Sequence, residues 1–568
     1  MIHRNIFFWV VAAFLFLVTE LQGQSQTFSP VWEIGKKDNS ASEFALYRDS
    51  YTSYPQLFRE GVAIYAIGKS NEKDIPYFIP GREDAWAGNI SGKLMIRFGV
   101  DQYLPDAILK LKINLVETHP TSSPLLKISL NDFSIEKKTP AGSNSNFLNN
   151  KQTRSKGLSL EVELPASALQ RGDNLLVIAN VNGSWLAFDN ITLSADKPVT
   201  MTETKHAIDF INAYAIPALK YGKGGELEIP VKIEVANWSD KEQYVEVRAG
   251  NKTGQFTVDR GIHIVDLSLP EVKNDQEVEL QLIYNDRVVG GKRVKLEPVK
   301  KWMVYLIQHT HTDIGYTRPQ TEILREHLRY MDYAIEYCEL TENLPDDARF
   351  RWTCEATWTV NEYLKNRPQE QINKLKKYVN NGQIEITGMF FNMSEIVDEN
   401  SLKTFLQPLA LLKKHDIPVT TAMQNDVNGI AWCLADYFPD LGVKYLWMGQ
   451  HGHRALIPFN KPTLFKWESP SGKQMLAFRS DHYMTGNSLG VDQDDLSSLE
   501  PRLFSYLEGL NKKEYPFDAI AIQYSGYSTD NSPPSYSSSK LVEEWNNIYA
   551  YPKLRNGLPH EFMDDVAA

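Results

Sequence analysis

Cysteine is scarce in this chain of 568 residues, with only Cys338, Cys354 and Cys433 present. Small exported domains often rely on paired cysteines, and an odd set of three cannot form such a framework. Apolar residues make up 42% of the sequence, which lies inside the usual globular range. We therefore expect the stability of the fold to come from hydrophobic cores.

An excess of basic residues is also missing. Sixty lysines and arginines stand against 71 aspartates and glutamates, which leaves a formal net charge of −11. Proteins that bind a phosphate backbone normally carry a basic stripe or patch, and this sequence has none. We therefore expect no nucleic acid partner. Aromatic residues, at 11%, offer flat faces that carbohydrate binding uses but that β-rich cores also consume.

No apolar run reaches the roughly 20 residues that a membrane-spanning helix requires. The longest, Ile6–Val18, follows His3 and Arg4 and precedes the small residue Gly23. A basic end, a short apolar stretch and a small residue are typical of a secretory signal peptide. We expect residues 1–23 to be removed and the protein to be exported, periplasmic or secreted, with no membrane span left.

The length predicts three or four domains at roughly 150 residues each. Between residues 24 and 200, apolar and polar residues alternate, as in Leu109–Leu115 and Leu158–Leu164. Period two is typical of half-buried antiparallel strands, so we predict a β-sandwich there. A shorter β segment, with Leu227–Val235 as its clearest strand, predicts a small immunoglobulin-like β domain over 201–299.

From residue 300 to 568, apolar strands alternate with helical patterns, which indicates a parallel sheet. Pro319 and Pro368 each open a helical pattern. We predict an α/β barrel or an open parallel sheet, whose chemistry gathers at the carboxyl ends of the strands. Seven strands are predicted, at 302–307, 349–353, 384–387, 419–423, 444–448, 475–478 and 519–523.

Polar residues follow these strands, and the first strand is the clearest case. It runs into a segment in which His309, His311 and Asp313 alternate, so two or three of these side chains can point into one cavity. Imidazole and carboxylate are ligands that suit zinc, which needs further ligands from elsewhere. A lone strand-end histidine is more often a hydrogen-bonding residue, but the acids at the other strand ends favour a site here.

The segment His309–Tyr316, with the sequence HTHTDIGY, resembles the opening HxHxDxGW signature of glycoside hydrolase family 38, the metal-dependent retaining α-mannosidases. The similarity continues through Trp352–Glu355, Asn425–Gly429 and Leu441–Tyr445, and covers about 302–568, nearly half of the chain. The resemblance implies a seven-stranded (β/α)7 barrel as catalytic domain, one zinc ion and hydrolysis of mannose-containing glycans.

The resemblance also implies roles for residues. His311 and Asp313 would bind zinc, with His309 beside them as a further candidate at the metal. Tyr316 stands at the position of the family's tryptophan and would stack on the sugar. Our other candidates for substrate binding are Glu355, Arg479 and Asp530.

The family's nucleophile is an aspartate in a loop after the third strand, and this chain departs from that pattern. Met393 stands where the aspartate is expected, and its side chain cannot act as a nucleophile. We predict Glu395 as the nucleophile, with Asp398 as second choice. The acid/base is predicted to be Asp426 or Asp481, although the NDVNG sequence around Asp426 is also ordinary turn and N-cap chemistry.

The family supplies a further zinc-binding histidine from a region beyond the barrel. The sequence ends at Ala568 before such a region. We expect either that this chain is truncated at its C-terminus or that His451, His453 or His482 substitutes.

The N-terminal half resembles the C-terminal β-sandwich of rhamnogalacturonan lyases, which is domain III of polysaccharide lyase family 4. The resemblance is carried by Trp32–Asp38, Ile67–Ser70, Trp86 and Phe188–Ile191. It implies a jelly-roll domain over 24–200 that is considered carbohydrate-binding. Either tryptophan, taken by itself, is more readily a core residue than a sugar platform.

Together these patterns predict an exported zinc-dependent glycoside hydrolase, a retaining α-mannosidase that acts on a mannose-containing glycan or a plant or host polysaccharide. One alternative is a zinc-dependent polysaccharide deacetylase or amidohydrolase, in which His309 and His311 both bind the metal. The other is a catalytically degenerate barrel that binds glycans, which Met393 favours.

Overall fold

The computed structural model describes residues 27–568, apart from 48–49, 59–60, 150–156, 394–395, 428, 450–451 and 453–458. The predicted signal peptide, the predicted nucleophile Glu395, and His451 and His453 lie outside these described residues.

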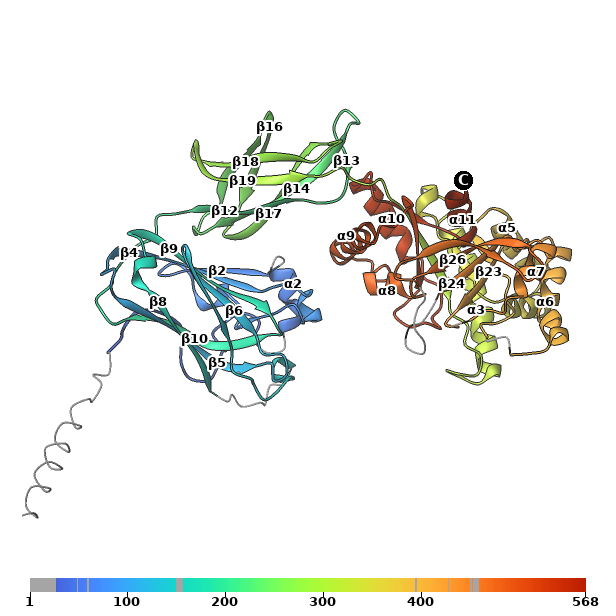
Figure 1. The fold of residues 1–568 in the computed structure, drawn as a ribbon, viewed down its shortest axis with the longest axis horizontal. Coiled ribbons are helices and arrows are strands. Elements are labelled where there is room, and N and C mark those ends of the chain that lie inside the picture. Colours follow the sequence, from blue (N-terminus) through green and yellow to red (C-terminus); the bar gives the residue numbers. More distant parts are fainter. Residues whose placement is uncertain are drawn as a thin grey trace, which may run out of the picture. The chain divides into compact units, whose positions relative to one another are not determined.

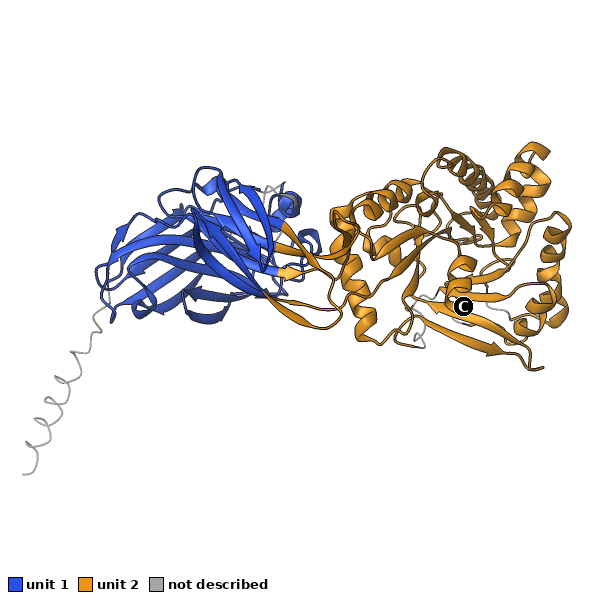
Figure 2. Ribbon diagram, turned by 90° about the horizontal axis from the view of Figure 1, so that it is seen from above, with its two compact units in different colours: residues 1–213, 233–265, 279–293 blue, residues 214–232, 266–278, 294–568 orange. Residues whose placement is uncertain are grey.

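The chain divides into two compact units, which Figure 2 draws in different colours. The units interleave over the middle of the sequence, so the predicted boundaries at 200 and 299 stay predictions. The first unit comprises 1–213, 233–265 and 279–293, and the second 214–232, 266–278 and 294–568.

Two mainly antiparallel sheets form a sandwich-like N-terminal part, as the alternating pattern predicted (Figure 1). In Leu109–Leu115 the apolar side chains are buried and the lysines between them are half-buried, because successive residues of a strand point to opposite faces. Both sheets contribute to one core, in which Trp32 is buried and against which Trp86 packs. These two tryptophans therefore serve the core.

The first of these sheets has the order β1 (Ser29–Gly35), β10 (Leu186–Ala195), β5 (Ile108–Thr118) and β8 (Leu158–Pro165), with β3 (Phe78–Ile79) on β10. The second has the order β11 (Thr200–Thr202), β4 (Lys93–Gln102), β9 (Gly172–Asn182), β6 (Leu125–Leu130) and β7 (Phe133–Lys138), with β2 (Val62–Ala66) on β4. Helix α2 is Tyr54–Leu57, and short 3-10 helices lie at Tyr51–Ser53, Glu72–Asp74, Ala85–Ala87, Phe147–Asn149 and Ala166–Ala168.

Two further β-sheets follow in the sequence. The strand predicted at 227–235 lies in β14, where its alternating Ile229, Val231, Ile233 and Val235 are buried. One sheet has the order β12 (Ile208–Ala215), β14 (Leu227–Asn237) and β13 (Lys220–Tyr221), with β17 (Gly261–Pro270) on β14. The other has the order β16 (Lys252–Val258), β15 (Gln243–Ala249), β18 (Gln276–Tyr284) and β19 (Arg287–Leu296).

The C-terminal part contains all seven predicted strands, in two sheets whose neighbours run parallel except for the added strand β25. One sheet has the order β22 (Ile384–Ile386), β21 (Trp352–Cys354), β20 (Met303–Thr310) and β27 (Ala519–Ser525), with β28 (Lys553–Asn556) on β20. The other has the order β23 (Thr421–Asn425), β24 (Tyr445–Gly449), β26 (Gln474–Ser480) and β25 (Thr463–Glu468). A parallel α/β region is therefore present, while its closure into a (β/α)7 barrel stays a prediction.

Helices connect these strands as the sequence pattern indicated. Helix α3 begins directly after Pro319 and buries Ile323, Leu328 and Met331 on one face. Among the described residues, no helix has both the length and the apolar character needed to cross a bilayer. The helices are α3 (Gln320–Leu340), α4 (Thr357–Asn366), α5 (Gln369–Asn380), α6 (Glu399–Lys414), α7 (Leu434–Asp440), α8 (Thr485–Leu489), α9 (Leu496–Lys512), α10 (Ser537–Ile548) and α11 (Pro559–Ala567), with a 3-10 helix at Asp346–Ala348.

A buried amide network joins the strands of these two parallel sheets. Gln523 Oε1 accepts hydrogen bonds from Trp447 Nε1 at 2.8 Å and Ser480 Oγ at 2.9 Å. Gln523 Nε2 donates to Asn425 Oδ1 at 3.3 Å, and the same oxygen accepts the Gly449 N–H at 2.9 Å. Because Gln523 lies on β27 and its partners on β23, β24 and β26, the network fixes the strand ends relative to one another.

The network leaves no room for a side chain at Gly449. A methyl group there would lie 2.2 Å from Asn425 Oδ1 and 2.5 Å from Gln523 Oε1. We predict that Gly449→Ala lowers the free energy of unfolding by about 1–3 kcal/mol, as overpacking does, measured by urea unfolding. Gly509→Ala in α9 is the matched control, because no atom lies within 4 Å of its added methyl group. Equal stability of the two variants would contradict the close packing.

Candidate functional site

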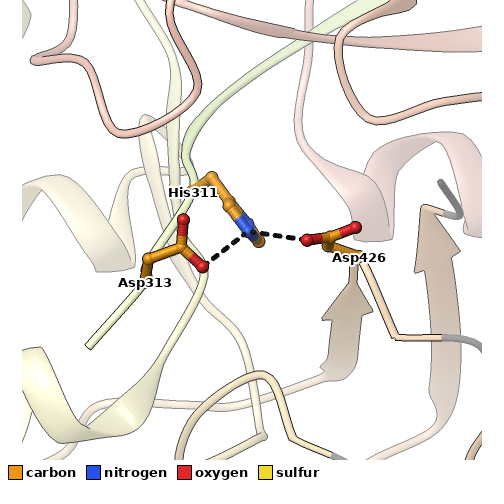
Figure 3. A group of neighbouring side chains, drawn as sticks. All are labelled: His311, Asp313 and Asp426. Carbon is orange, nitrogen blue, oxygen red and sulfur yellow. Dashed lines mark ion pairs between the residues drawn. The ribbon is translucent and has the colours of Figure 1, made fainter. Parts of the chain in front are cut away.

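Three titratable side chains meet where parallel strands end: His311, Asp313 and Asp426 each offer one ligand atom, and these atoms lie within 4.8 Å of one another. His311 Nε2 is 3.4 Å from Asp313 Oδ1 and 4.0 Å from Asp426 Oδ2. Figure 3 shows the imidazole between the two carboxylates. The imidazole is buried and both aspartates are half-buried. The sequence predicted His311 and Asp313 as metal ligands and Asp426 as an acid/base candidate, and the structure brings the three together.

The backbone at two strand ends brings these residues together. Strand β20 ends at Thr310, so His311 and Asp313 continue directly from it, and Asp426 follows the last residue of β23. Asp426 has a φ of 58°, a left-handed conformation that aspartate adopts more readily than most residues. Its N–H donates to Gly449 O at 2.9 Å, which fixes this turn against β24.

Glu355 lies behind His311, at the end of β21. Its carboxylate oxygens are 3.1 and 3.2 Å from His311 Nδ1. One of them also accepts the Thr312 N–H at 3.1 Å and lies 3.7 Å from His309 Nδ1. A carboxylate only accepts, so His311 Nδ1 carries the proton and Nε2 faces the aspartates. The predicted substrate-binding residue Glu355 is thus buried behind the imidazole, in the arrangement that commonly orients a metal-binding histidine.

Asn531 holds Asp313 through two hydrogen bonds. Its Oδ1 accepts the Asp313 N–H at 2.9 Å, and its Nδ2 donates to Asp313 Oδ2 at 2.7 Å. Asp313 Oδ1 is thereby left to face His311. Sequence reasoning missed Asn531, and its only signal was its place next to Asp530 in the loop after β27.

Tyr483 contacts both histidines of the HTHTD segment. Its backbone oxygen accepts a hydrogen bond from His309 Nε2 at 2.8 Å. Its ring stacks on that of His311, with centroids 4.6 Å apart and an interplanar angle of 26°. His309, the further candidate at the metal, is therefore fully buried, and it is not a member of the three-residue group.

The charges of this group are strongly coupled. Burial alone would lower the pKa of His311, but the carboxylates of Glu355 and Asp313 outweigh it and raise the pKa well above its usual value. Burial acts to raise the pKa of Glu355, yet the two histidines hold it far below its usual range. The pKa of Asp313 is also lowered against burial, by His311 and Asn531. Without a metal, the His311 imidazole is protonated and lies among carboxylates. A metal cation in place of that proton would be stabilised by the same carboxylates.

The loop after β22 brings an amide to the site. Asn392 Oδ1 accepts the Asn425 N–H at 3.0 Å, and its Nδ2 lies 3.5 Å from His311 Nδ1. The neighbouring Met393 contributes its backbone oxygen to Gln424 Nε2 at 2.9 Å. Asp398, our second choice for the nucleophile, caps α6 by accepting the Ser401 N–H at 2.9 Å.

Two predicted residues at the end of β26 have partners elsewhere. Asp481 Oδ2 accepts the Tyr506 hydroxyl at 2.8 Å, and Arg479 donates to the backbone oxygens of Phe459 and Lys461. Ser480 between them points to Gln523 instead. Adjacent residues of a strand point to opposite faces, so the structure does not bring Asp481 and Arg479 into the His311 group.

The remaining predicted residues lie around the group. Asp530 is half-buried, and its backbone oxygen accepts the His311 N–H at 3.2 Å. His482 stacks on Tyr483 with ring centroids 4.4 Å apart. Tyr316 is 78% exposed, which leaves its ring accessible to a ligand.

We predict that Glu355→Gln lowers the pKa of His311, because it removes the largest influence that raises it. A raised pKa in the folded protein adds stability that is complete below the unfolded value of about 6.5 and is lost as the pH rises through the folded value. The variant should lack this contribution. Its free energy of unfolding should therefore change less with pH above about 6.5 than that of the parent.

Histidine NMR titration and urea unfolding between about pH 5 and pH 9, both with a chelator present, measure these effects. The parallel His560→Gln variant is the control. It removes another histidine whose pKa is raised, His560, which lies 2.9 Å from a carboxylate oxygen of Glu385. This variant should leave the titration of His311 unchanged. An unaltered His311 titration in Glu355→Gln would contradict the coupling.

Two family models match parts of the chain. Residues 301–568 match the model of the glycosyl hydrolases family 38 N-terminal domain, and residues 30–193 match that of polysaccharide lyase family 4, domain III. No curated protein sequence matches the chain. Among solved structures, an alpha-mannosidase from Enterococcus faecalis V583 is 16% identical with a TM-score of 0.39, over 47% of this chain and 29% of that one.

A glycosyl hydrolase family 38 protein from Enterococcus faecalis is 13% identical with a TM-score of 0.35, over 47% of this chain and 28% of that one. The chain thus covers less than a third of the length of either protein. The family models agree with both resemblances found in the sequence motifs. The segment 301–568 therefore resembles the N-terminal domain of glycoside hydrolase family 38 and contains the His311 group, and the segment 30–193 resembles domain III of polysaccharide lyase family 4.

Proposed function

We propose that residues 300–568 act as a zinc-dependent retaining α-mannosidase on glycans, and that the protein works after export. The observation that carries this proposal is the His311 group, an imidazole and two carboxylates at the strand ends of a family 38 domain. Export is inferred from the sequence of residues 1–23 alone. The substrate would be a mannose-containing glycan or a plant or host polysaccharide, to which the module at 30–193 would also bind.

The donor set fits a zinc ion. His311, Asp313 and Asp426 would hold it, and mixed imidazole and carboxylate ligands are typical of zinc. Glu355 supports the histidine and Asn531 supports Asp313, as outer partners do in metal sites. When bound, the ion supplies positive charge that orients sugar hydroxyls and offsets negative charge at the reacting centre.

The chain's own residues divide the remaining tasks. A retaining glycosidase needs two carboxyl groups roughly 5–5.5 Å apart, a nucleophile and an acid/base. We assign the nucleophile to Glu395. Of the two acid/base candidates, Asp481 is bonded to Tyr506, whereas Asp426 lies at the His311 group, where it would serve either as a metal ligand or in proton transfer. Tyr316, with its exposed ring, would stack on the sugar.

The deacetylase alternative is less well supported. It needs His309 and His311 to bind the metal together, but His309 Nε2 donates to a backbone oxygen and Nδ1 faces Glu355. Neither ring nitrogen of His309 is directed to the group.

A second candidate function is glycan binding without turnover. Asn392 favours it, because the described side chain that reaches His311 from the nucleophile loop is an amide. An amide and the neighbouring Met393 cannot supply the attacking carboxylate, so hydrolysis depends on Glu395.

We predict that purified protein takes up one zinc ion per chain and releases nitrophenolate from a nitrophenyl α-mannoside. Asp313→Asn should weaken zinc binding by at least about 100-fold and abolish hydrolysis, because it removes a ligand charge. Glu395→Gln should abolish hydrolysis with metal content unchanged. Elemental analysis and the chromogenic assay measure both properties.

Asp426→Asn separates two roles of that residue. Lost zinc would assign Asp426 to the metal, whereas retained zinc with a loss of turnover of about 100-fold or more would assign it to proton transfer. Asp495→Asn, at the N-cap of α9, is the control because asparagine caps as well as aspartate. Absence of zinc uptake would overturn the proposal. Bound zinc and glycan without turnover, measured by calorimetry, would favour the binding function, and acetate release from an acetylated glycan would favour the deacetylase.

A further inference from the structure

Tyr483 lies in the segment between β26 and α8, where sequence reasoning singled out Asp481 and His482. The residue is 2% exposed and lies between His482 and Met484. Tyr483 is a buried residue whose backbone and ring contact the two histidines that follow β20.

The first contact holds His309. A backbone oxygen can only accept, so the hydrogen bond of 2.8 Å from His309 Nε2 to Tyr483 O fixes which nitrogen carries that proton. The other nitrogen of His309 is thereby directed to Glu355, at 3.7 Å from its nearer carboxylate oxygen. The backbone of Tyr483 thus fixes the orientation of His309 beside the carboxylate that lies behind His311.

The second contact holds His311 itself. The tyrosine ring lies against one face of the imidazole, at 4.6 Å between centroids and 26° between planes. The Glu355 contact at Nδ1 restrains the ring at one edge only, and rotation about that edge would move Nε2 away from the aspartates. A flat ring packed on the imidazole face opposes this rotation.

Two neighbouring residues restrain Tyr483 in turn. His482 stacks on it with centroids 4.4 Å apart and an interplanar angle of 21°. The backbone of Gly449 approaches so closely that a methyl group there would lie 3.0 Å from Tyr483 Cβ. The tyrosine ring therefore has little freedom to follow a rotation of His311.

We propose that Tyr483 is a positioning residue: its ring fixes the plane of the His311 imidazole so that Nε2 points at the space between Asp313 and Asp426. The proposal rests on the proposed metal function of that group. It assigns to the β26–α8 segment a role in metal affinity that does not require Tyr483 to touch the ion or the sugar.

The test compares Tyr483→Phe with Tyr483→Leu, because phenylalanine keeps the flat ring and leucine removes it. Both variants keep the backbone contact with His309. Zinc affinity is measured by competition with a chromophoric chelator at fixed pH, and folding by thermal unfolding of the metal-free protein. We expect Tyr483→Phe to bind zinc within about 3-fold of the parent and Tyr483→Leu to bind it about 10–100-fold more weakly.

Tyr515→Leu is the matched control. Tyr515 is also buried and stacked, on Trp302 at 5.8 Å between centroids, and it contacts neither histidine. Its loss should leave zinc affinity unchanged. Tyr483→Met, which fills the space with a flexible apolar side chain, replaces the leucine variant if that variant does not fold. Parent-like zinc affinity in a folded variant that lacks the ring would overturn the proposal.

A metal-independent readout separates this proposal from the proposed function. In the metal-free protein the tyrosine ring current should shift the His311 ring-proton resonances, and the shift should disappear in Tyr483→Leu and persist in Tyr515→Leu. A parent protein that takes up no zinc would overturn the proposed function. His311 resonances unchanged by the loss of the Tyr483 ring would overturn the stacking on which this inference depends.

Discussion

The contact between His311 Nδ1 and the buried carboxylate of Glu355 is the interaction on which the rest of the site depends. It makes one ring nitrogen a donor and leaves the other as the nitrogen that faces Asp313 and Asp426. A carboxylate buried this deeply needs compensating partners, and His311 and Thr312 provide them, with His309 3.7 Å away. The HTHTD segment is thus shaped by a single negative charge at the end of the neighbouring strand.

Parallel strand pairing explains how so many distant residues reach one place. The side chains or backbone atoms of the site come from the ends of β20, β21, β23, β26 and β27, and β20 runs parallel to β21 and β27 in one sheet, as β24 does to β23 and β26 in the other. Gln523 and Asn425 bridge the two sheets at this level, so the position of Asp426 depends on residues far from it in sequence. This layer of buried amides therefore both joins the two sheets and positions Asp426.

Local patterns were sufficient to predict the strands and the start of the site. Seven apolar runs predicted seven of the strands, though not β25 or β28, and HTHTDIGY predicted His311 and Asp313, because each signal lies within a few neighbouring residues. Asn531 and Tyr483 escaped prediction, since their roles arise from contacts across more than 150 positions of sequence. The faces of the sheet to which Arg479 and Asp481 point depend on the exact register at the end of β26. A shift of one residue there would send each side chain to the opposite face.

The left-handed backbone at Asp426 limits which amino acids can occupy that corner. Aspartate and asparagine tolerate such a conformation, whereas alanine and β-branched residues would strain it. An exchange of aspartate for asparagine would therefore alter one formal charge beside the imidazole while the turn keeps its shape. At this corner, a single substitution is able to change the electrostatics of the site while the loop that carries it keeps its backbone conformation.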